Sequence, residues 1–468
     1  MSPLDDLSTI AACCPTLTAP ADIEPYARDW SGRYAHPPRA VLRPGSTEEV
    51  AAALCACAAV GLAVVPSGGR TGLCGGAVPR AEGAPTVVLS LERMNRIRAV
   101  DARDFSITVD AGCTVRAVQD AAAAAGRLFP LSFGAEGTAQ IGGALSTNAG
   151  GIRTIRWGNA RDLVLGLEVV LPDGRVLNDL RRVRKDNTGY ALRHLFIGGE
   201  GTLGVITGAA LKLAPALRAR ETAFLEVPSP AAALALLDRL ISNGAELIGF
   251  ELIGRWPLEL VRRHAPRARI PFALQSPWYV LMELGTAAAG ADLRTPLEVA
   301  LAAAIEAGEA GEVVIAESEE QRAALWYLRE VMPECNRAEA PSVSADTSVP
   351  VSAVPSFLAE VEAALATRWP EGKLIALGHA GDGNVHISLQ APRGTPREVW
   401  HRNAEAIEDT VNRIAVAHGG SFSAEHGIGQ SKRHAMAALR DSVALDLMRA
   451  IKAALDPRGM MNPGKLLP

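Results

Sequence analysis

The hydrophobic pattern from Arg43 to about Pro215 consists of short β-like runs separated by glycine-rich turns. Apolar and polar residues alternate in SITVDAG at 106–112 and in LVLGLEVVLPDGRVL at 163–177, which is typical of strands. The PDG triplet inside the second run is a turn sequence and predicts a hairpin. This part of the chain is therefore predicted to be mainly β.

Two helices within this region are predicted from their end signals. Ser46 and Glu49 have the spacing of a capping box, so a helix is expected to run from there to about Ala59. Gly61 is its predicted stop, and the strand LAVVP follows directly. A second, alanine-rich helix is expected at 117–125.

Strand-like and helix-like segments alternate after Pro215. The expected strands lie at 222–228, 246–252, 278–284 and 312–318, and the expected helices at 230–242, 257–264, 296–308, 320–329, 356–368, 396–418 and 443–455. The segments 210–220 and 336–343 are expected to be connectors. This alternation predicts an α+β domain whose antiparallel sheet is covered on one face.

Composition excludes several classes of protein. The 468 residues are enough for roughly two to four domains. Lys and Arg number 47 against 51 Asp and Glu, and the formal net charge of −4 argues against a nucleic-acid binder, which usually carries a basic face. Charged residues at 21% and hydrophobic residues at 48% are typical of a globular protein and exclude a disordered one.

Cysteine usage and the N-terminal sequence predict a cytoplasmic location. Seven cysteines without a CxxC pair fit neither a disulfide framework nor a thiolate zinc site, so small buried thiols are expected. The start, MSPLDDLST, is acidic and lacks the basic region of a signal peptide. The apolar run 50–65 is too short to span a membrane. Peripheral association with the inner membrane remains an open alternative.

Three glycine-rich segments are candidates for binding a ligand that carries phosphates. They are PSGGRTGLCGGAVP at 66–79, SFGAEGTAQIGGALSTNAGG at 132–151 and GGEGTLGVIT at 198–207. Glycine permits positive φ and lets backbone N–H groups approach an anion, and the second segment adds small polar side chains. An ordinary long turn is the alternative for the first segment.

The third segment contains G-x-G-x-x-G, but its context argues against a Rossmann fold. That fingerprint must open a helix whose N-terminus carries the pyrophosphate. Here the β-like stretch VITGAALKLAP follows, and Pro215 closes it. NAD bound in a Rossmann domain is therefore rejected.

These three segments resemble, in order, the flavin loops of the vanillyl-alcohol-oxidase-type FAD family. The tail DPRGMMNPGKLLP at 456–468 resembles that family's ending, so the resemblance runs from about Pro38 to Pro468. It implies an α+β fold with a two-subdomain FAD-binding domain and an α+β cap domain with an antiparallel sheet. The expected division is 1–216 for the FAD domain, 217–410 for the substrate or cap domain, and 411–468 for a C-terminal helical segment that returns to the FAD domain.

The resemblance also implies the flavin contacts and the mode of attachment. Some relatives attach FAD through a histidine in the first loop, but this loop has Arg70 and no histidine, so non-covalent FAD is expected. The implied contacts are Pro66, Ser67, Gly68, Gly69, Arg70, Thr71, Gly72, Leu73, Gly75 and Gly76 in the first loop, Gly134, Gly137, Thr138, Gly142, Gly143, Ser146, Thr147, Asn148 and Gly150 in the second, Glu200, Gly201, Gly204, Val205 and Ile206 in the third, and Asn462 in the tail.

Two further motifs carry residues suited to a metal and to acid–base chemistry. LGHAGDGNVHIS contains His379, Asn384 and His386, and SFSAEHGIGQSKR contains Glu425 and His426. Two histidines and one carboxylate form a common catalytic metal set that leaves positions open for substrate. The alternative is that these are core histidines with ordinary hydrogen-bond partners.

GHAGDGNVH and EHGIG resemble the D-2-hydroxy-acid dehydrogenase branch of the family, which includes D-lactate and D-2-hydroxyglutarate dehydrogenases. The resemblance implies that His379, His386 and Glu425 bind a divalent metal, Zn²⁺ or Mn²⁺, with His379 also contacting the substrate. It implies that His426 is the catalytic base and that Asn384 binds substrate.

Two positions bear on which acid is oxidised. YLREVMPE at 327–334 resembles the family's LRE segment, which implies that Arg329 binds a substrate carboxylate. The alternative is a surface arginine paired with Glu330 or Glu334. The hydroxyglutarate-type members carry lysine where this chain has Ser344, which favours monocarboxylic substrates, although YARDWSGRY near the N-terminus resembles those members.

The predicted enzyme is thus an FAD-dependent dehydrogenase that oxidises a D-2-hydroxy acid to the 2-oxo acid. The expected electron acceptor is a quinone, an electron-transfer flavoprotein or a cytochrome, no nucleic acid is expected as a partner, and a homodimer is left open. Two rivals remain: a flavin transferase of the ether-lipid-synthase type, and the flavin subunit of a glycolate-oxidase-like complex.

Overall fold

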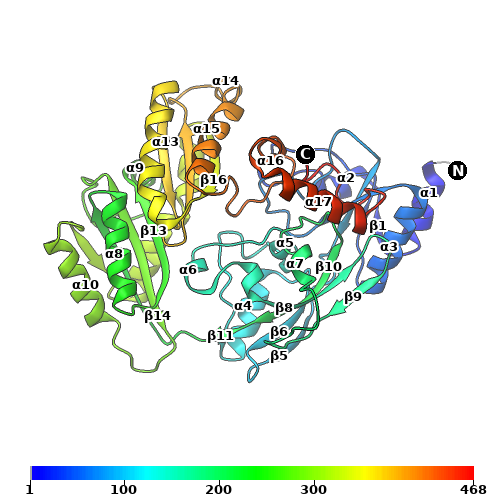
Figure 1. Cartoon of the computed structure of the whole chain (residues 1–468), viewed down its shortest axis with the longest axis horizontal. Coiled ribbons are helices and arrows are strands. Elements are labelled where there is room, and N and C mark those ends of the chain that lie inside the picture. The colour runs from blue at the N-terminus through cyan, green and yellow to red at the C-terminus, as the bar shows by residue number, and fades with distance from the viewer. Residues whose placement is uncertain (1–2) are drawn as a thin grey trace. The chain divides into compact units, whose positions relative to one another are not determined.

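A computed structural model describes residues 3–468 and divides the chain into two compact units (Figure 1). The first unit comprises the residues up to Gly150, Trp157–Ala216 and Glu425–Pro468, and the second comprises Gly151–Arg156 and Leu217–Ala424. The last segment of the chain thus belongs to the same unit as the first segments.

The first unit contains two main sheets. A four-stranded sheet has the order β1 (Thr16–Leu17), β2 (Val41–Leu42), β4 (Thr86–Ser90) and β3 (Ala63–Ser67), in which β2, β4 and β3 are parallel. An antiparallel five-stranded sheet has the order β5 (Ile97–Asp101), β6 (Ser106–Asp110), β10 (Val205–Lys212), β8 (Val164–Val170) and β9 (Val176–Asp179). A short pair is formed by β7 (Arg127–Leu128) and β11 (Ala214–Pro215).

The helices of this unit are α1 (Pro3–Ala11), α2 (Pro20–Ile23), α3 (Thr47–Val60), α4 (Val115–Ala124), α5 (Ile141–Ser146), α7 (Arg193–Phe196), α16 (Arg433–Leu439) and α17 (Ser442–Leu455). Most of them share one apolar core with the sheets, whereas Ile23 of α2 packs in a smaller cluster with Val41, Val65 and Val88. The short helix α6 (Thr154–Trp157) lies at the boundary between the units.

The predicted local signals in this unit are confirmed. The Ser46 side chain caps α3 by accepting from the Glu49 amide at 3.2 Å, and Gly61 ends the helix with φ +73°. The PDG triplet connects β8 to β9 as a hairpin. The G-x-G-x-x-G segment leads into strand β10 rather than a helix, which confirms that it is not a Rossmann fingerprint.

The second unit is built on one antiparallel seven-stranded sheet. Its order is β15 (Val313–Ile315), β12 (Ala219–Val227), β14 (Trp278–Thr286), β13 (Leu247–Gly254), β17 (Lys373–Gly378), β18 (Asn384–Gln390) and β16 (Ser342–Ser348). Its helices are α8 (Pro230–Ser242), α9 (Arg255–His264), α10 (Arg294–Glu306), α11 (Glu319–Glu330), α12 (Met332–Glu339), α13 (Val354–Arg368), α14 (Arg397–His401) and α15 (Ala404–Ala417).

The prediction that this sheet is covered on one face is wrong. Alternate residues of β13 belong to two different apolar clusters: Leu252 packs with α8, α10, α13 and α15, whereas Ile253 packs with α9, α11 and α12. Because successive strand residues point to opposite faces, helices cover both faces of the sheet. Figure 1 shows α8 and α13 together on one of these faces.

Two other expectations about this region are also wrong. The helix expected at 396–418 is two helices, α14 and α15, because the chain turns at Arg402 and Asn403. The connector expected at 336–343 is instead the end of α12 and the start of β16. Its polar residues lie on the exposed side of a helix whose other side is buried, so low hydrophobicity alone did not indicate a loop.

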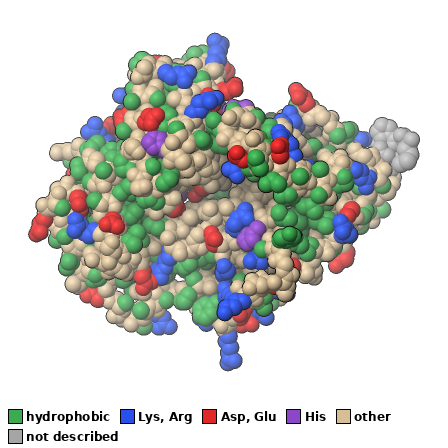
Figure 2. All heavy atoms as spheres, viewed as in Figure 1, with side chains coloured by type: hydrophobic (Ala, Val, Ile, Leu, Met, Phe, Trp, Pro, Cys, Tyr) green, Lys and Arg blue, Asp and Glu red, His purple; other side chains and the backbone are tan. Residues whose placement is uncertain are grey.

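The surface of the protein carries charges of both signs. Acidic and basic side chains are interspersed over the face drawn in Figure 2, in agreement with the small net charge. Among residues 3–468, no helix combines the length and the apolar character that a membrane crossing requires.

Candidate active site

The first two glycine loops approach each other backbone to backbone in the first unit. A Cβ atom added to Gly69, just after β3, would lie 2.0 Å from the carbonyl oxygen of Thr138, whereas one added to Gly68 would make an ordinary contact of 3.5 Å with Gly143. A side chain at Gly69 cannot be accommodated without moving the second loop. Glycine is required here by close packing rather than by a positive φ.

Several predicted flavin contacts have features that suit a bound dinucleotide. Arg70, Asn148 and Glu200 adopt positive φ values of 57°, 52° and 48°, a conformation that turns successive backbone N–H groups into concave sites. The hydroxyl of Ser67 is buried without a hydrogen-bond partner, and so is the side-chain oxygen of Gln140, a residue of the second loop that the prediction did not include. Such atoms are costly unless a ligand or water satisfies them, so the loops fit a large polar cofactor such as FAD.

Glu200 links the third loop to the segment that follows the predicted base. Its carboxylate accepts hydrogen bonds from the Ile428 and Gly429 amides, each at 2.7 Å. Burial raises the pKa of Glu200, and these two amides oppose that rise. The Asn462 amide donates to the Glu200 backbone oxygen at 2.7 Å and to the Gly76 oxygen at 3.0 Å. Glu200 and Asn462 thus hold backbone segments together, besides being predicted flavin contacts.

The predicted metal ligands converge at one place. His379 follows the end of β17 and His386 lies on β18, with ring centroids 5.4 Å apart and ring planes at 85°. One ligand atom each from these rings and from Glu425 lies within 4.8 Å of the others. Glu425 directly follows Ala424, whose amide donates to the Asp346 carbonyl at 3.3 Å.

Both imidazoles have a carboxylate at Nδ1. The His386 Nδ1 lies 3.2 Å from Asp346, and the His379 Nδ1 is hydrogen-bonded to Glu251. A carboxylate that accepts from Nδ1–H favours the tautomer whose Nε2 is unprotonated, and this is the nitrogen that can bind a metal. This donor set therefore fits a divalent cation of the Zn²⁺ or Mn²⁺ class.

The substrate-binding candidates lie in the same unit as the two histidines. The Asn384 amide donates to Asp346 at 3.0 Å and to the Thr347 carbonyl at 2.9 Å, while its own side-chain oxygen is buried without a partner. Ser344 is exposed on β16, where its hydroxyl lies 2.7 Å from that of Ser388. His426 is half-buried and follows Glu425.

Arg329 pairs with neither of the surface acids that were considered for it. Its Nε lies 2.6 Å from Glu251, which is fully buried, and only 12% of the Arg329 side chain is exposed. Burial by itself would raise the pKa of Glu251, but His379 and Arg329 hold it well below its usual range. Sequence reasoning missed Glu251. The available signal was a lone charged residue within the apolar run LIGFELIG at 247–254.

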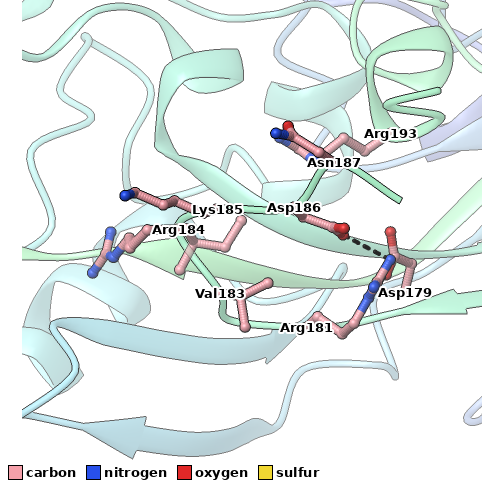
Figure 3. Close-up of a pocket in the computed structure, with 9 residues that line it drawn as sticks. Asp179, Arg181, Val183, Arg184, Lys185, Asp186, Asn187 and Arg193 are labelled. Carbon is pink, nitrogen blue, oxygen red and sulfur yellow. Dashed lines mark hydrogen bonds and ion pairs between the residues drawn. The ribbon is translucent and has the colours of Figure 1, made fainter. Parts of the chain in front are cut away.

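A separate pocket of about 500 Å³ lies in the first unit beside the edge strand β9 (Figure 3). Cations line it, and Arg181 pairs with two acids, Asp179 and Asp186, at 2.5 and 2.8 Å. The other lining cations are Arg184, Lys185 and Arg193. None of these residues belongs to the predicted flavin contacts or metal ligands.

Comparison with protein families gives two adjacent matches. Residues 38–179 match the model described as FAD binding domain, and residues 216–466 match FAD linked oxidases, C-terminal domain. The second match covers more than half of the chain.

Individual relatives match over nearly the whole chain. A protein of Xanthomonas citri pv. viticola named D-2-hydroxyglutarate dehydrogenase is 40% identical over 96% of this chain and 93% of its own. A mitochondrial protein of Bos taurus with the same activity in its name is 35% identical over 99% of this chain and 84% of its own. A Schizosaccharomyces pombe protein named as a putative D-lactate dehydrogenase is 34% identical over 96% of this chain and 85% of its own.

Solved structures share the fold at low identity. An alkyldihydroxyacetonephosphate synthase superposes with a TM-score of 0.74 at 17% identity, covering 100% of this chain and 86% of its own. A p-cresol methylhydroxylase superposes with a TM-score of 0.74 at 16% identity, covering 99% and 96%. These likenesses bear on the fold alone and confirm the predicted vanillyl-alcohol-oxidase-type architecture.

Proposed function

This chain belongs to the FAD-linked oxidase family, and we propose that it is an FAD-dependent dehydrogenase that oxidises a D-2-hydroxy acid to the 2-oxo acid with help from a divalent metal. The observation that carries this proposal is the convergence of His379, His386 and Glu425, with His426 next in the chain. The dehydrogenase names of relatives at 34–40% identity support the reaction class.

The glycine loops of the first unit would hold FAD without a covalent bond. FAD, when bound, accepts the hydride from C2 of the hydroxy acid. The chain's own contribution would be binding and orientation: the backbone amides around Arg70 and Asn148 would donate to the cofactor's phosphates, and the Ser67 hydroxyl would gain a partner.

His379, His386 and Glu425 would hold the metal. A divalent cation bound there lowers the pKa of a coordinated hydroxyl group, as it does for water. His426 would take up the hydroxyl proton on an imidazole nitrogen, since a neutral imidazole is a competent base near neutral pH.

Arg329 and Asn384 would orient the substrate. Arg329 uses its Nε for Glu251, so its two terminal NH₂ groups are the donors left for a carboxylate. The unpartnered side-chain oxygen of Asn384 is an acceptor for a hydroxyl group. With Ser344 in place of lysine, we expect monocarboxylic D-2-hydroxy acids to rival D-2-hydroxyglutarate.

An anaerobic titration tests the proposal directly. Flavin absorbance of the purified protein is followed while a panel of D- and L-2-hydroxy acids is added. D-isomers should bleach the flavin, and denaturation should release intact FAD. Flavin that stays oxidised with every D-2-hydroxy acid would contradict the reaction, and flavin that remains with precipitated protein would contradict non-covalent binding.

The electrons must leave to a second acceptor, which we propose is a quinone, an electron-transfer flavoprotein or a cytochrome. Reoxidation of the reduced flavin by each acceptor class, measured in the same anaerobic cell, distinguishes them. A chain that bleaches on its own does not need the partner subunits of a glycolate-oxidase-like complex.

A further inference from the structure

Glu251 occupies a position where a charged side chain is unusual. It lies on β13, near the middle of the seven-stranded sheet, and is the only charged residue between Leu247 and Gly254. Its side chain is 0% exposed. Because a buried carboxylate is stable only with partners, its contacts indicate what it is there to hold.

The strand register brings Glu251 to His379. Leu252 pairs with Gly378 across the antiparallel strands β13 and β17, so the next residue on each strand is Glu251 on one and His379 on the other. Glu251 also lies on the same sheet face as Ile253, which packs against α11, the helix that carries Arg329. Sheet register and helix packing thus converge on one carboxylate.

Each carboxylate oxygen has a different partner. One oxygen is hydrogen-bonded to the His379 Nδ1, and the other accepts from the Arg329 Nε at 2.6 Å. The second metal-site histidine, His386, has a different carboxylate at its Nδ1, that of Asp346. Glu251 is therefore the group that connects the metal site to the predicted carboxylate-binding arginine.

We propose that Glu251 is a positioning residue that fixes the His379 ring and the Arg329 guanidinium with a single carboxylate. This proposal rests on the proposed function, since it gives His379 a metal to bind and Arg329 a substrate carboxylate. Accepting a hydrogen bond from Nδ1–H selects the tautomer whose Nε2 is unprotonated and able to bind a metal. Accepting from Nε aims the two terminal NH₂ groups of Arg329 away from Glu251.

Glu251→Gln tests the proposal in the FAD-loaded protein. Glutamine keeps the size, but it carries one acceptor oxygen and an NH₂ group that cannot accept from a second donor. Zn²⁺ and Mn²⁺ affinity should fall by about 10–100-fold, the usual effect of removing such a partner from a ligand histidine. The KM for the hydroxy acid should also rise. Metal affinity is measured by competition with a chromophoric chelator, independently of turnover.

Glu283→Gln is the matched control. Glu283 is a buried carboxylate on the neighbouring strand β14, and it lies 3.6 Å from the Nε of Arg322, which is also on α11. It therefore shares the strand-to-helix pairing of Glu251 without a histidine. Glu283→Gln should leave metal affinity and KM within about twofold of wild type, even where thermal stability falls.

Arg329→Gln distinguishes the effect of Glu251 on Arg329 from its effect on His379. This variant keeps the contact between Glu251 and His379, so KM should rise while metal affinity stays near the wild-type value. Glu251→Asp, which retains the charge, should recover part of the lost metal affinity. It also serves as the test if Glu251→Gln does not fold.

The outcomes separate this proposal from the proposed function. Unchanged metal affinity in Glu251→Gln, or an equal loss in Glu283→Gln and Arg329→Gln, overturns the positioning role and leaves the metal site standing. A wild-type protein that binds neither Zn²⁺ nor Mn²⁺ overturns the metal site and this proposal together.

Discussion

At the residue scale, His426 offers a way to separate proton transfer from metal binding. Glu425, one residue earlier, is grouped with the two histidines, whereas His426 is not. His426→Ala should slow flavin reduction by at least ~10²-fold, the usual size of general-base catalysis, and should leave the metal content unchanged. Stopped-flow reduction and metal analysis of the same preparation check this.

Loss of the metal from His426→Ala would give His426 a different role. If the variant loses its metal in proportion to its activity, His426 is a ligand rather than the base. His434 is a suitable control, because it lies on α16, outside the grouped ligands, and His434→Ala should leave both measurements near wild type.

The residue at position 344 is predicted to set the preference between dicarboxylic and monocarboxylic substrates. Its hydroxyl meets only a neutral hydroxyl, that of Ser388, in the contacts described above. Ser344→Lys would add a cation, and a charge-assisted hydrogen bond contributes ~1.5–3 kcal/mol. The ratio of kcat/KM for D-2-hydroxyglutarate over D-lactate should therefore rise by about 10-fold or more.

A lysine at an unrelated exposed serine controls for net charge. Ser356→Lys on α13 adds the same charge, and it should leave this ratio unchanged. A strong wild-type preference for the diacid that Ser344→Lys does not move would show that this position does not read the distal carboxylate.

Candidate site residues could be predicted from the sequence only where several of them lie within one short segment. His379, His386 and Glu425 were predicted as one set, and the structure groups their ligand atoms. The partner of Arg329 could not be predicted, because Glu251 lies 78 residues away and is brought to it by strand register and helix packing. A local pattern offers only nearby acids such as Glu330, which is why the alternative of a surface pairing named the wrong partner.

At the scale of elements, the glycine loops allow a sharp test of the cofactor cradle. A Cβ at Gly69 would lie 2.0 Å from the Thr138 oxygen, so Gly69→Ala must push the first two loops apart. Gly69→Ala should therefore lose most of the FAD that the wild-type protein retains.

The ratio of flavin to protein absorbance in freshly purified samples of Gly69→Ala and wild type measures this loss. A wild-type flavin content in Gly69→Ala would contradict the close packing of the loops as a requirement for FAD binding. Reconstitution with added FAD shows whether Gly69→Ala lowers affinity or prevents folding.

Elements themselves were predictable where their ends carry signals. The cap at Ser46, the stop at Gly61 and the PDG hairpin all follow from local chemistry, and the structure confirms them. Coverage of the seven-stranded sheet was not predictable in the same way. Strands such as LIGFELIG are buried on both faces, so their continuous apolar sequence does not say how many layers of helix cover them.

At the scale of the whole molecule, the two cofactor sites draw on different parts of the chain. Every predicted flavin contact belongs to the first unit, whereas His379 and His386 belong to the second. Chelation should therefore abolish flavin reduction by substrate without releasing FAD, and adding Zn²⁺ or Mn²⁺ back should restore it. Flavin fluorescence of the filtrate after treatment with chelator measures any release. Full activity in metal-free protein would contradict the metal assignment.

The C-terminal segment returns to the first unit and buries a lysine there. The Lys465 Nζ donates to the Val78 oxygen at 2.7 Å, beside the first glycine loop. Burial, followed by the charge of Arg80, lowers the pKa of Lys465 to about 7, and Glu200 opposes this shift. Folding therefore holds this lysine in an environment that disfavours its charged form.

The pH dependence of stability follows from this lowered pKa. An unfolded lysine titrates near ~10.4, so between pH 7 and about 10 the unfolded chain binds more protons at this site than the folded one. The contribution of Lys465 to stability is therefore least favourable below pH 7 and rises with pH, by at most about 1.4 kcal/mol per pH unit. Removing Lys465 would also raise the pKa of Glu200 further, which acts in the same direction.

Lys465→Met removes the titrating group while keeping an apolar chain of similar length. Urea unfolding of the FAD-saturated proteins at pH 7, 8 and 9 should show wild type gaining stability relative to the variant at each step, because every other titrating group except Glu200 is common to both. Which protein is more stable at pH 7 also depends on the hydrogen bond to Val78 that the variant loses. The informative quantity is therefore how the difference between the two unfolding free energies changes with pH. Parallel stability curves would mean that Lys465 is not held with a lowered pKa, and that the C-terminal segment is secured to the first loop by a fully charged lysine.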